Sequence, residues 1–423
     1  MEKFISYLKP LGSGLVCFLL YQFSLGQEVA PALHTEIFAF IQKEKVPGMA
    51  MGFIQPQDSG LSVFGYREYE KRLKVEPTTY FGLGEVSQIF THALMMKMEL
   101  EGQIDLYRPL AEQVTPRVTV PLFSRMTYEF LQASEIRHPK EYPGVPIWGG
   151  FSCGKVIDTP LVPITYCRLA THFAGLCPQP GSKGRWLLSK KYRPDKRQFP
   201  LISSEEILTQ FSSRELCAKP GESFQYSDWG IAVLGQLLTV NSTLSYGQMV
   251  KEEVFDPINM QHTHAKLEED ELYDLAQGYS LKGKKQAPIF WEGMVPSMGI
   301  YSTPQDMMHF LQYASRSHSS ILHHAIRNTQ APEVKLSPAP KDWEGLEVGY
   351  GWWIQESIQG EYRKVWAEGR GSGYAAYIGY IEDQKRGVFL LANRSTSLRE
   401  LGEKMLAILA KEGKGKLISK VIN

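Results

Sequence analysis

The sequence has almost no net charge. Its 46 lysines and arginines and 45 aspartates and glutamates leave a formal net charge of +1 at pH 7. Such a balance creates no field that would attract nucleic acid or an anionic membrane surface. With 43% hydrophobic and 22% charged residues, the composition is otherwise that of a globular protein. We therefore expect no nucleic-acid partner and a function that depends on a local site.

A hydrophobic run long enough to span a membrane is also missing. Two lysines precede an apolar run from Leu15 to Leu25, which has roughly half the length that a spanning helix needs. Ser24 and Gly26 place small residues at −3 and −1 of a cut after Gly26. This pattern predicts a signal peptide over residues 1–26, with a permanent anchor as the alternative. We expect an exported protein, periplasmic or secreted, with no integral membrane span after signal removal.

Cysteine is scarce, and no C-x-x-C spacing occurs. Cys167 with His172 is the only nearby pair of Cys and His, so the sequence favours disulfides over zinc. After signal removal an even number of cysteines remains, as in an exported protein with two disulfides, and three pairings are open. We expect neither a metal nor a cofactor. The disulfide candidates are Cys153, Cys167, Cys177 and Cys217.

Glu85 and Gln88 form the most informative pair in the chain. After Gly84, apolar residues recur at helical spacing as far as Met98, and Gly102 ends the pattern. Side chains three positions apart project from the same face of a helix. The predicted helix from Glu85 to about Glu101 therefore presents two polar groups side by side near its start.

This stretch resembles the first active-site motif of the serine β-lactamase and penicillin-binding-protein superfamily, which includes class C β-lactamases, DD-peptidases and esterases. The family motif S-x-x-K supplies a serine nucleophile and its lysine partner. Glu85 stands at the serine position and Gln88 at the lysine position. The residues that match the family around them are Gly84, Val86, Ser87, Phe90, Thr91, Ala93, Gly102 and Leu106.

Two further segments resemble the remaining motifs. The segment Pro220 to Gly230 resembles P-G-x-x-F-x-Y-S-N-x-G, in which Tyr226 matches the tyrosine that assists proton transfer and Asp228 replaces the asparagine. The segment from Ala367 resembles H-x-G or K-T-G, with Ala367 in place of the histidine or lysine and Gly369 as the glycine. Arg370 then matches the position whose backbone amide binds the acyl oxyanion.

Other segments bear on the fold. Val254 to Met260 and Ser297 to Met307 resemble family segments that carry no chemistry, and Thr303 is the expected N-cap of a helix. His172 ends a segment that resembles the family's L-L-x-H-x-S-G-L. The resemblance implies that this histidine shapes the end of a helix and is not the catalytic base.

The resemblance implies an α/β (α+β) fold of the β-lactamase/transpeptidase type, in one domain over 27–423. An N-terminal hairpin and a C-terminal meander form a central antiparallel sheet, flanked by terminal helices, with a mainly helical lobe beside it. We expect the site at the seam between the sheet and the lobe. The expected parts are a sheet and terminal helices at about 37–66 and 345–411, a lobe at about 85–300 and a surface insertion at 108–163.

Acyl transfer in this family needs a hydroxyl nucleophile, a base and two oxyanion donors. The hydroxyl and the lysine are both absent at positions 85 and 88, and in subtilisin the loss of the nucleophile alone lowers turnover by about 2 × 10⁶. Ser152 fits both G-x-S-x-G and S-x-x-K and is the alternative nucleophile. Prolines and glycines around Ser152 disfavour the strand and helices that these motifs require, so a turn beside Cys153 is the competing interpretation.

Two functions remain open. The first is a noncatalytic pseudoenzyme that binds a peptidoglycan-like peptide, another small acyl ligand or a protein in the retained cleft. The second is a serine hydrolase, either a β-lactamase, a DD-peptidase or an esterase, with an unconventional nucleophile such as Ser152. We favour the first because two separate motifs have lost their key polar groups while the segments that specify the fold remain readable.

Overall fold

The structure is a computed structural model. It describes residues 30–116, 118–122, 162–177, 202–290, 292–315, 318–335, 346–356, 360 and 362–421. The predicted signal peptide, Ser152, Cys153 and most of the predicted insertion at 108–163 lie outside these ranges.

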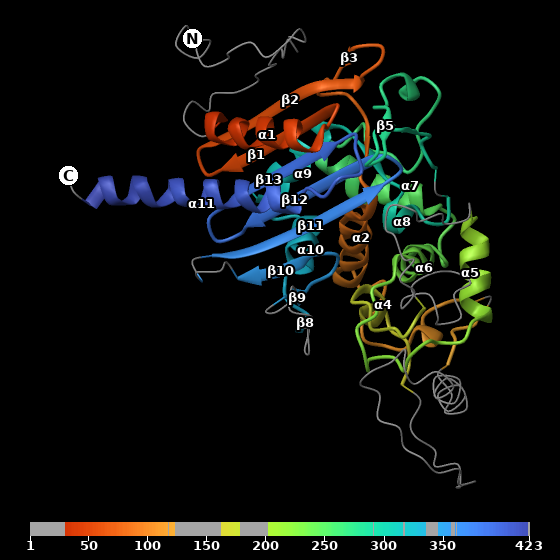
Figure 1. The fold of residues 1–423 in the computed structure, drawn as a ribbon. Coiled ribbons are helices and arrows are strands. Elements are labelled where there is room, and N and C mark those ends of the chain that lie inside the picture. Colours follow the sequence, from red (N-terminus) through yellow and green to blue (C-terminus); the bar gives the residue numbers. More distant parts are fainter. Residues whose placement is uncertain are drawn as a thin grey trace, which may run out of the picture.

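A large antiparallel sheet forms the centre of the molecule (Figure 1). The N-terminal hairpin pairs with the last strand of the C-terminal meander, which joins the two ends of the chain in one sheet. The predicted central antiparallel sheet is thus confirmed. Within the described ranges its strands are, in spatial order, β3 (Leu73–Lys74), β2 (Asp58–Glu68), β1 (Gly48–Gln55), β13 (Arg386–Ala392), β12 (Tyr374–Ile381), β11 (Arg363–Gly371), β10 (Trp353–Glu356), β9 (Glu347–Val348) and β8 (Val334–Lys335).

Each face of the sheet packs against its own layer of the molecule. The side chains of a strand alternate between the two faces, so neighbouring residues belong to different cores. Val388 and Leu390 of β13 face the terminal helices α1 (Ala30–Glu44) and α11 (Arg399–Val421). Phe389 and Leu391 face a second core shared with the helical lobe. The helices around this second core are α2 (Gln88–Leu100), α4 (Tyr166–Ala170), α5 (Ser204–Ser213), α6 (Asp228–Leu238), α7 (Tyr246–Val250), α8 (Val295–Met298), α9 (Pro304–Ser315) and α10 (Ile321–Thr329).

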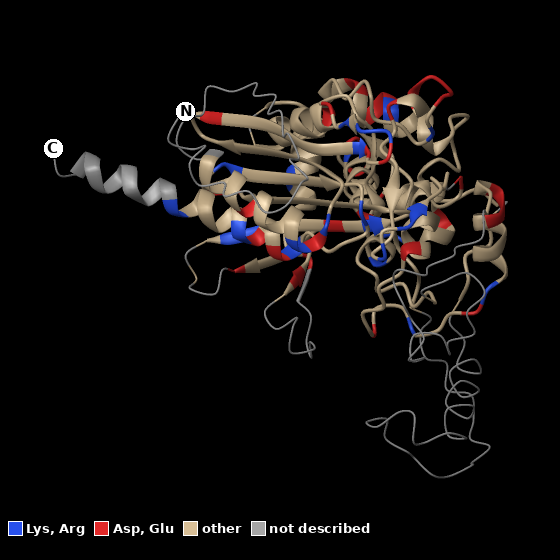
Figure 2. Ribbon diagram, turned by 45° about the horizontal axis from the view of Figure 1, so that its top comes forward, with Lys and Arg blue, Asp and Glu red and all other residues tan. Residues whose placement is uncertain are grey.

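Short elements complete the described fold. The paired strands β4 (Phe81–Gly82) and β7 (Tyr301–Ser302) lead into the site, and β5 (Gly278–Tyr279) pairs with β6 (Lys285–Gln286). The remaining turns are η2 (Gly84–Ser87), η3 (Leu110–Glu112), η5 (Lys251–Phe255), η6 (Asp256–Ile258) and η7 (Glu271–Tyr273). Lys and Arg are interspersed with Asp and Glu along the ribbon (Figure 2).

Several helix boundaries differ from those expected. The helix predicted from Glu85 begins instead with the 3₁₀ turn η2, and α2 starts at Gln88. The helix α11 extends as far as Val421, beyond the expected end of the C-terminal part at about residue 411. The predicted N-cap of α9 is confirmed, because the hydroxyl of Thr303 accepts a hydrogen bond from the backbone N–H of Asp306 at 3.2 Å.

Among the described residues, no helix is both long enough and apolar enough to cross a membrane.

Candidate functional site

Two glycines bring strand β11 against the turn η2. A Cβ atom on Gly84, where φ is +54°, would lie 2.6 Å from the backbone nitrogen of Arg370. A Cβ atom on Gly369 would lie 2.2 Å from the carbonyl oxygen of Leu83 and 2.5 Å from the nitrogen of Glu85. Glycine is therefore needed on both sides of this contact. The first and third motifs can lie against each other because Gly84 and Gly369 have no side chain at the point of contact.

The carboxylate of Glu85 binds the strand that borders the site. Its Oε2 atom accepts a hydrogen bond from the backbone N–H of Arg370 at 2.6 Å. Position 370 is where the resemblance places a donor for the acyl oxyanion, so in this structure that donor is engaged by the protein's own carboxylate.

Gln88 lies one turn further along and faces the second motif. Its Nε2 atom donates to the hydroxyl of Tyr226 at 2.9 Å and to Oδ1 of Asp228 at 3.2 Å. Gln88 is 4% exposed, so these bonds satisfy a buried amide. An amide nitrogen donates protons and takes none up. Gln88 can thus hold Tyr226 and Asp228 in place but cannot act as a base.

Asp228 is positioned by the start of helix α6. Ser227 is the N-cap, and its hydroxyl accepts from the backbone N–H of Gly230 at 2.9 Å. Asp228 is the first residue of the helix, where the helix dipole favours a negative charge. An acid at this position also matches Gln88, which presents an amide donor to it. The replacements at 88 and 228 therefore form one complementary pair.

Tyr226 belongs to a wall of aromatic rings. Its ring centroid lies 4.5 Å from that of His172 and 6.3 Å from that of Trp353, and the planes of the Tyr226 and Trp353 rings are 22° apart. Nδ1 of His172 accepts a hydrogen bond from the backbone N–H of Ser227 at 3.2 Å. Burial, with a smaller contribution from the charge of His92, lowers the pKa of His172 to about 3, so the ring is neutral and can accept. This geometry supports a positioning role for His172.

The charged side chains of the third motif are engaged by other groups of the protein. Ala367 belongs to the core on the side of the lobe, whereas Oε1 of Glu368 accepts hydrogen bonds from the hydroxyl of Ser397 at 2.7 Å and from the backbone N–H of Leu398 at 2.8 Å. The guanidinium Nε of Arg370 lies 4.0 Å from the same Glu368 oxygen. The binding candidate Arg370 thus contributes its backbone N–H to the site, while its side chain pairs with Glu368.

These groups enclose one cavity at the seam between the sheet and the lobe. It holds about 340 Å³ of empty space, part of which is open to solvent. The site candidates Glu85, Gln88, Tyr226 and Ala367 line it together, and Asp228, Gly369 and Arg370 contact them. The remaining lining residues are His172, Val348, Gly351, Trp352, Trp353 and Glu368.

Sequence reasoning missed two residues of this region. Trp353 lies in the predicted meander, and the pair of consecutive tryptophans beside glycines is the feature that could have marked it. His92 lies in the predicted helix, where nothing in the pattern sets it apart. It is buried beneath Gln88, with Nδ1 2.6 Å from the carbonyl oxygen of Gln88 and Nε2 3.2 Å from that of Ala170. Burial lowers the pKa of His92 to about 4, although both carbonyl groups oppose this shift.

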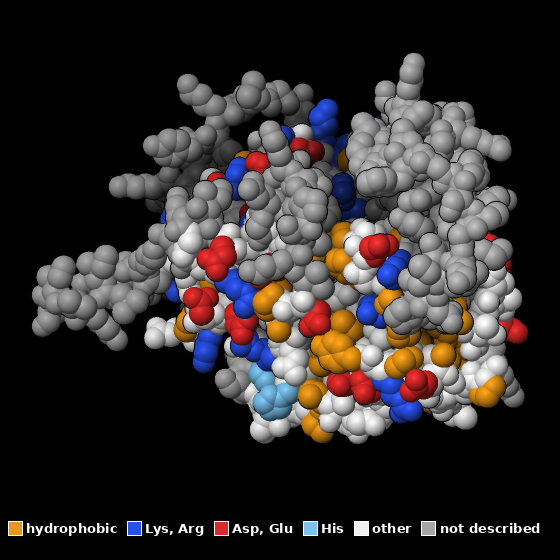
Figure 3. All heavy atoms as spheres, turned by 90° about the horizontal axis from the view of Figure 1, so that it is seen from below, with side chains coloured by type: hydrophobic (Ala, Val, Ile, Leu, Met, Phe, Trp, Pro, Cys, Tyr) orange, Lys and Arg blue, Asp and Glu red, His pale blue; other side chains and the backbone are white. Residues whose placement is uncertain are grey.

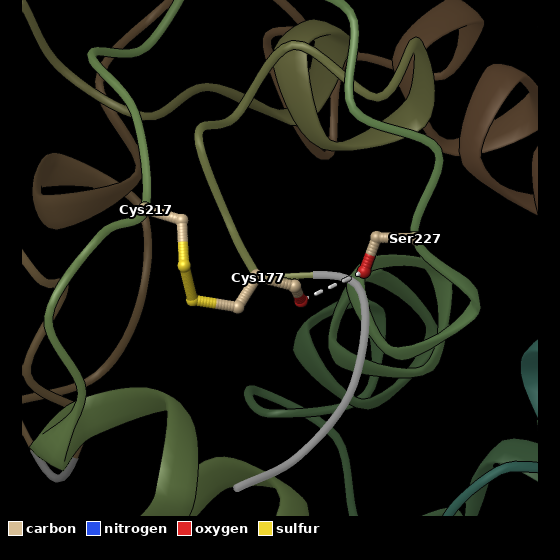
Figure 4. Close-up of a disulfide and its surroundings, with 3 residues drawn as sticks. All are labelled: Cys177, Cys217 and Ser227. Atoms are coloured by element: carbon tan, nitrogen blue, oxygen red, sulfur yellow. Dashed lines mark hydrogen bonds between the residues drawn. A yellow bond between two sulfur atoms is a disulfide. The ribbon is translucent and has the colours of Figure 1, made fainter. Parts of the chain in front are cut away.

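A disulfide joins Cys177 to Cys217 near the second motif (Figure 4). The carbonyl oxygen of Cys177 accepts a hydrogen bond from the hydroxyl of Ser227 at 3.2 Å, so the crosslinked segment supports the residue that caps α6. Two of the four disulfide candidates are thereby paired.

The expectation for Cys167 is wrong in this structure, because its thiol is free. The sulfur lies 3.5 Å from Oε1 of Glu333 and 3.6 Å from the hydroxyl of Tyr350, in a half-buried position between these two side chains. Burial raises the pKa of the Cys167 thiol to about 11, which keeps it protonated and weakly nucleophilic. Cys153, the remaining disulfide candidate, lies outside the described residues.

Within the part of the chain that the structure describes, no three His, Cys, Asp or Glu side chains gather in a way that would hold a metal ion. The alternative nucleophile Ser152 is not among the described residues, so its role stays a prediction.

Comparison with known proteins gives a match over most of the chain. The family model described as Beta-lactamase matches residues 33–411. The chain is 23% identical over 402 residues to Beta-lactamase of Escherichia coli (strain K12), with 88% of this chain and 91% of that protein covered. It is 22% identical over 362 residues to D-alanyl-D-alanine-carboxypeptidase/endopeptidase AmpH of the same strain, with 83% and 80% covered. Protein flp of Staphylococcus aureus (strain MW2) is 20% identical over 360 residues, with 84% and 61% covered.

Proposed function

Because the chain belongs to the β-lactamase family, we propose that it keeps the family's cleft as a binding site for a small acyl ligand and does not turn the ligand over. The observation that carries this proposal is the hydrogen bond from the backbone N–H of Arg370 to the carboxylate of Glu85. The protein's own side chain engages the donor that a reacting carbonyl oxygen would need.

The replacements around this bond remove the other requirements of acyl transfer. A carboxylate stands at position 85 where the family has a hydroxyl nucleophile, and the amide of Gln88 donates to its neighbours where a base must accept a proton. Each loss alone lowers the rate strongly, since a positioned general base contributes about 10²–10⁴ in rate. The site therefore supports binding better than catalysis.

The lining of the cavity supports an acyl ligand. Tyr226 and Trp353 offer aromatic surface, and the methyl group of Ala367 replaces a polar side chain. The cleft is narrow, because the volume open to water is about 20 Å³, little more than the roughly 10–15 Å³ that one water molecule needs, so a ligand must lie largely in its open mouth. We choose N-acetyl-D-alanyl-D-alanine as the probe, because the name of one relative specifies a D-alanyl-D-alanine carboxypeptidase.

The experiment incubates the full mature chain with this dipeptide and measures heat by calorimetry and free D-alanine by chromatography. We expect saturable binding without release of D-alanine. Release of D-alanine at a rate above that of the buffer would overturn the noncatalytic assignment. Absence of saturable heat would show that the cleft does not take an acyl dipeptide.

A matched pair of variants locates the binding. Ala367→Leu adds a larger side chain at the cavity wall, whereas Ala331→Leu adds the same side chain at an exposed position outside it. Ala367→Leu should abolish the binding heat, and Ala331→Leu should leave it unchanged. Equal effects of the two substitutions would show that the dipeptide binds elsewhere.

We further propose that the protein is exported to the periplasm or secreted. The disulfide between Cys177 and Cys217 supports this location, because disulfides form and persist in oxidising compartments. The signal-peptide pattern in residues 1–26 points the same way. Sequencing the N-terminus of the protein recovered from its own cell should find Gln27 first, whereas a chain that starts at Met1 would contradict cleavage.

A further inference from the structure

The cleft of the proposed acyl site is acidic. Glu85 is part of its lining, and among the lining residues that the structure describes there is no lysine or arginine. Asp228 lies behind Gln88, whose amide donates to its carboxylate at 3.2 Å. The imidazole of His172 also lines the cleft, but it is neutral, mainly because burial lowers its pKa to about 3. The ionisable groups at the cleft therefore add up to a negative charge.

Glu368 and Arg370 leave this balance unchanged. The guanidinium Nε of Arg370 lies 4.0 Å from Oε1 of Glu368, so the two opposite charges compensate each other beside the cleft. Arg370 reaches the cleft with its backbone N–H, which donates to Glu85 and carries no net charge. The negative charge of Glu85 and Asp228 is thus not cancelled by this arginine.

The replacements at the four motif positions all change the charge in one direction. Where the resemblance places a serine, a lysine, an asparagine and a histidine or lysine, the chain has Glu85, Gln88, Asp228 and Ala367. Two of these replacements add a carboxylate, and the other two remove a basic side chain. None of them offsets another in charge. Together they favour a ligand whose bound group is positive.

This preference is local to the cleft, because the protein as a whole has no dominant sign of charge. The formal net charge is +1. On the face seen from below, Lys and Arg side chains lie among Asp and Glu side chains (Figure 3). Charges that alternate in this way produce no strong field over the surface. A cation is therefore selected by the cleft and not by the surface around it.

The aromatic wall of the cleft also suits a cation. The rings of Tyr226 and Trp353 belong to the lining, and their centroids lie 6.3 Å apart. The negative face of an aromatic ring attracts an ammonium group that lies within about 6 Å of the ring centroid. A positive group in the space between Glu85 and this wall is attracted by both.

The narrow interior of the cleft sets the size of that group. The volume open to water is about 20 Å³, little more than the roughly 10–15 Å³ that one water molecule needs. A primary ammonium group is close to a water molecule in size and fits this space. The rest of the ligand then lies in the open mouth of the cleft.

We propose that the acyl ligand of this cleft carries a primary ammonium group, which binds between the carboxylate of Glu85 and the rings of Tyr226 and Trp353. This inference rests on the proposed function, since it names the charge of the ligand that the same cleft takes. The bond from the backbone N–H of Arg370 takes up one of about four acceptor positions of the Glu85 carboxylate. An ammonium group has three donors and can bind to the same carboxylate.

The test compares three dipeptides that differ only at their ends. D-alanyl-D-alanine amide has a free ammonium group, N-acetyl-D-alanyl-D-alanine amide is neutral, and N-acetyl-D-alanyl-D-alanine carries a carboxylate. Each is titrated by calorimetry into the full mature chain at constant ionic strength and a pH of about 6.5, below the usual amino-terminal pKa of about 7.7–8.0. We expect the cationic dipeptide to have a Kd about tenfold below that of the neutral one, the effect of one hydrogen bond to a charged group. The anionic dipeptide should bind most weakly.

Three variants locate the attraction. Glu85→Gln removes the charge and keeps an oxygen that can accept from the N–H of Arg370. It should raise the Kd of the cationic dipeptide about tenfold and leave that of the neutral dipeptide unchanged. Trp353→Leu should raise the Kd of the cationic dipeptide about threefold relative to the neutral one. Glu269→Gln removes an exposed acid outside the cleft and should change neither Kd.

The outcomes separate this inference from the proposed function. Absence of heat with all three dipeptides would overturn the acyl site and the ammonium group together. If the neutral dipeptide binds as tightly as the cationic one, the acyl site stands and the ammonium group is overturned. A cation preference that survives in Glu85→Gln, or that falls equally in Glu269→Gln, would overturn it as well, because the attraction would then arise elsewhere. An equal change for both dipeptides in Trp353→Leu would overturn the role of the aromatic wall.

Discussion

Restoring the family residues at positions 85 and 88 should restore acylation only in part. The substitution Glu85→Ser frees the backbone N–H of Arg370 and supplies a hydroxyl at the start of the helix. Without a base, this variant should react with a fluorescent penicillin barely faster than the unmodified protein. Adding Gln88→Lys places an amine at the position that now contacts Tyr226 and Asp228.

Asp228 sets the size of the effect. Nε2 of Gln88 lies 3.2 Å from Oδ1 of Asp228, so an introduced ammonium would form an ion pair there. Two unit charges at about 4 Å interact by about 4 kcal/mol at an effective dielectric constant of 20. This raises the pKa of the lysine by about three units and lowers the fraction of neutral amine about 10³-fold. The double variant should therefore react slowly until Asp228→Asn is added.

We expect the order Glu85→Ser, then the double variant, then the triple variant, with the last step worth up to about 10³ in labelling rate. Intact-protein mass spectrometry of a time course with the fluorescent penicillin measures these rates. Adding Ser152→Ala to the triple variant is the control and should change nothing. A triple variant no faster than Glu85→Ser would refute the assignment of positions 85 and 88. A double variant as fast as the triple would refute the electrostatic role of Asp228.

Three further predictions concern the frame of the site. Gly369→Ala should lower the free energy of unfolding by about 1–3 kcal/mol in urea denaturation, because its Cβ would overlap the backbone of the turn η2. Removing the crosslink with Cys177→Ser and Cys217→Ser should cost about 4 kcal/mol by chain entropy for a sequence separation of 40, measured in the same way; an equal midpoint would contradict this. Burial lowers the pKa of His92 to about 4 and of His172 to about 3, below their usual 6.5, so stability is complete above about pH 6.5. It should fall by up to about 2.7 kcal/mol per pH unit between pH 6 and 4, and Tm values that are constant from pH 7 to 5 would oppose this.

The parts of the fold governed by local pattern could be predicted from the sequence. Turn residues between two apolar runs indicated the hairpin of β1 and β2, and runs of aromatic and β-branched residues separated by glycines and charges indicated the strands of the meander. The edge strand β8 and its neighbour β9 were not predicted, since two residues each are too few to show a period.

The candidate site could also be predicted only where it depends on local spacing. The relation of Glu85 to Gln88 is a matter of spacing on one turn and was readable. The partner of Glu85 is a backbone amide 285 residues away, which only the register of β11 against η2 can place. Trp353 enters the cavity through tertiary packing of the same kind, which the unusual tryptophan pair beside glycines does not itself specify.

The free thiol of Cys167 shows the limit of counting residues. An even number of cysteines predicts pairing only if the partners meet, and the backbone decides this. Cys167 lies beside the carboxylate of Glu333 and the hydroxyl of Tyr350. These neighbours lie 166 and 183 residues away along the chain, beyond the reach of any sequence motif.

The central claim is that Glu85 and Gln88 have replaced catalysis with a fixed hydrogen-bonded arrangement. The most direct test is the intact mass of the unmodified mature protein after exposure to a fluorescent penicillin and to a fluorophosphonate probe. With no hydroxyl at position 85 and no base at position 88, we predict that neither probe adds mass. A stoichiometric adduct would contradict the claim, and its loss in Ser152→Ala would assign the reaction to Ser152.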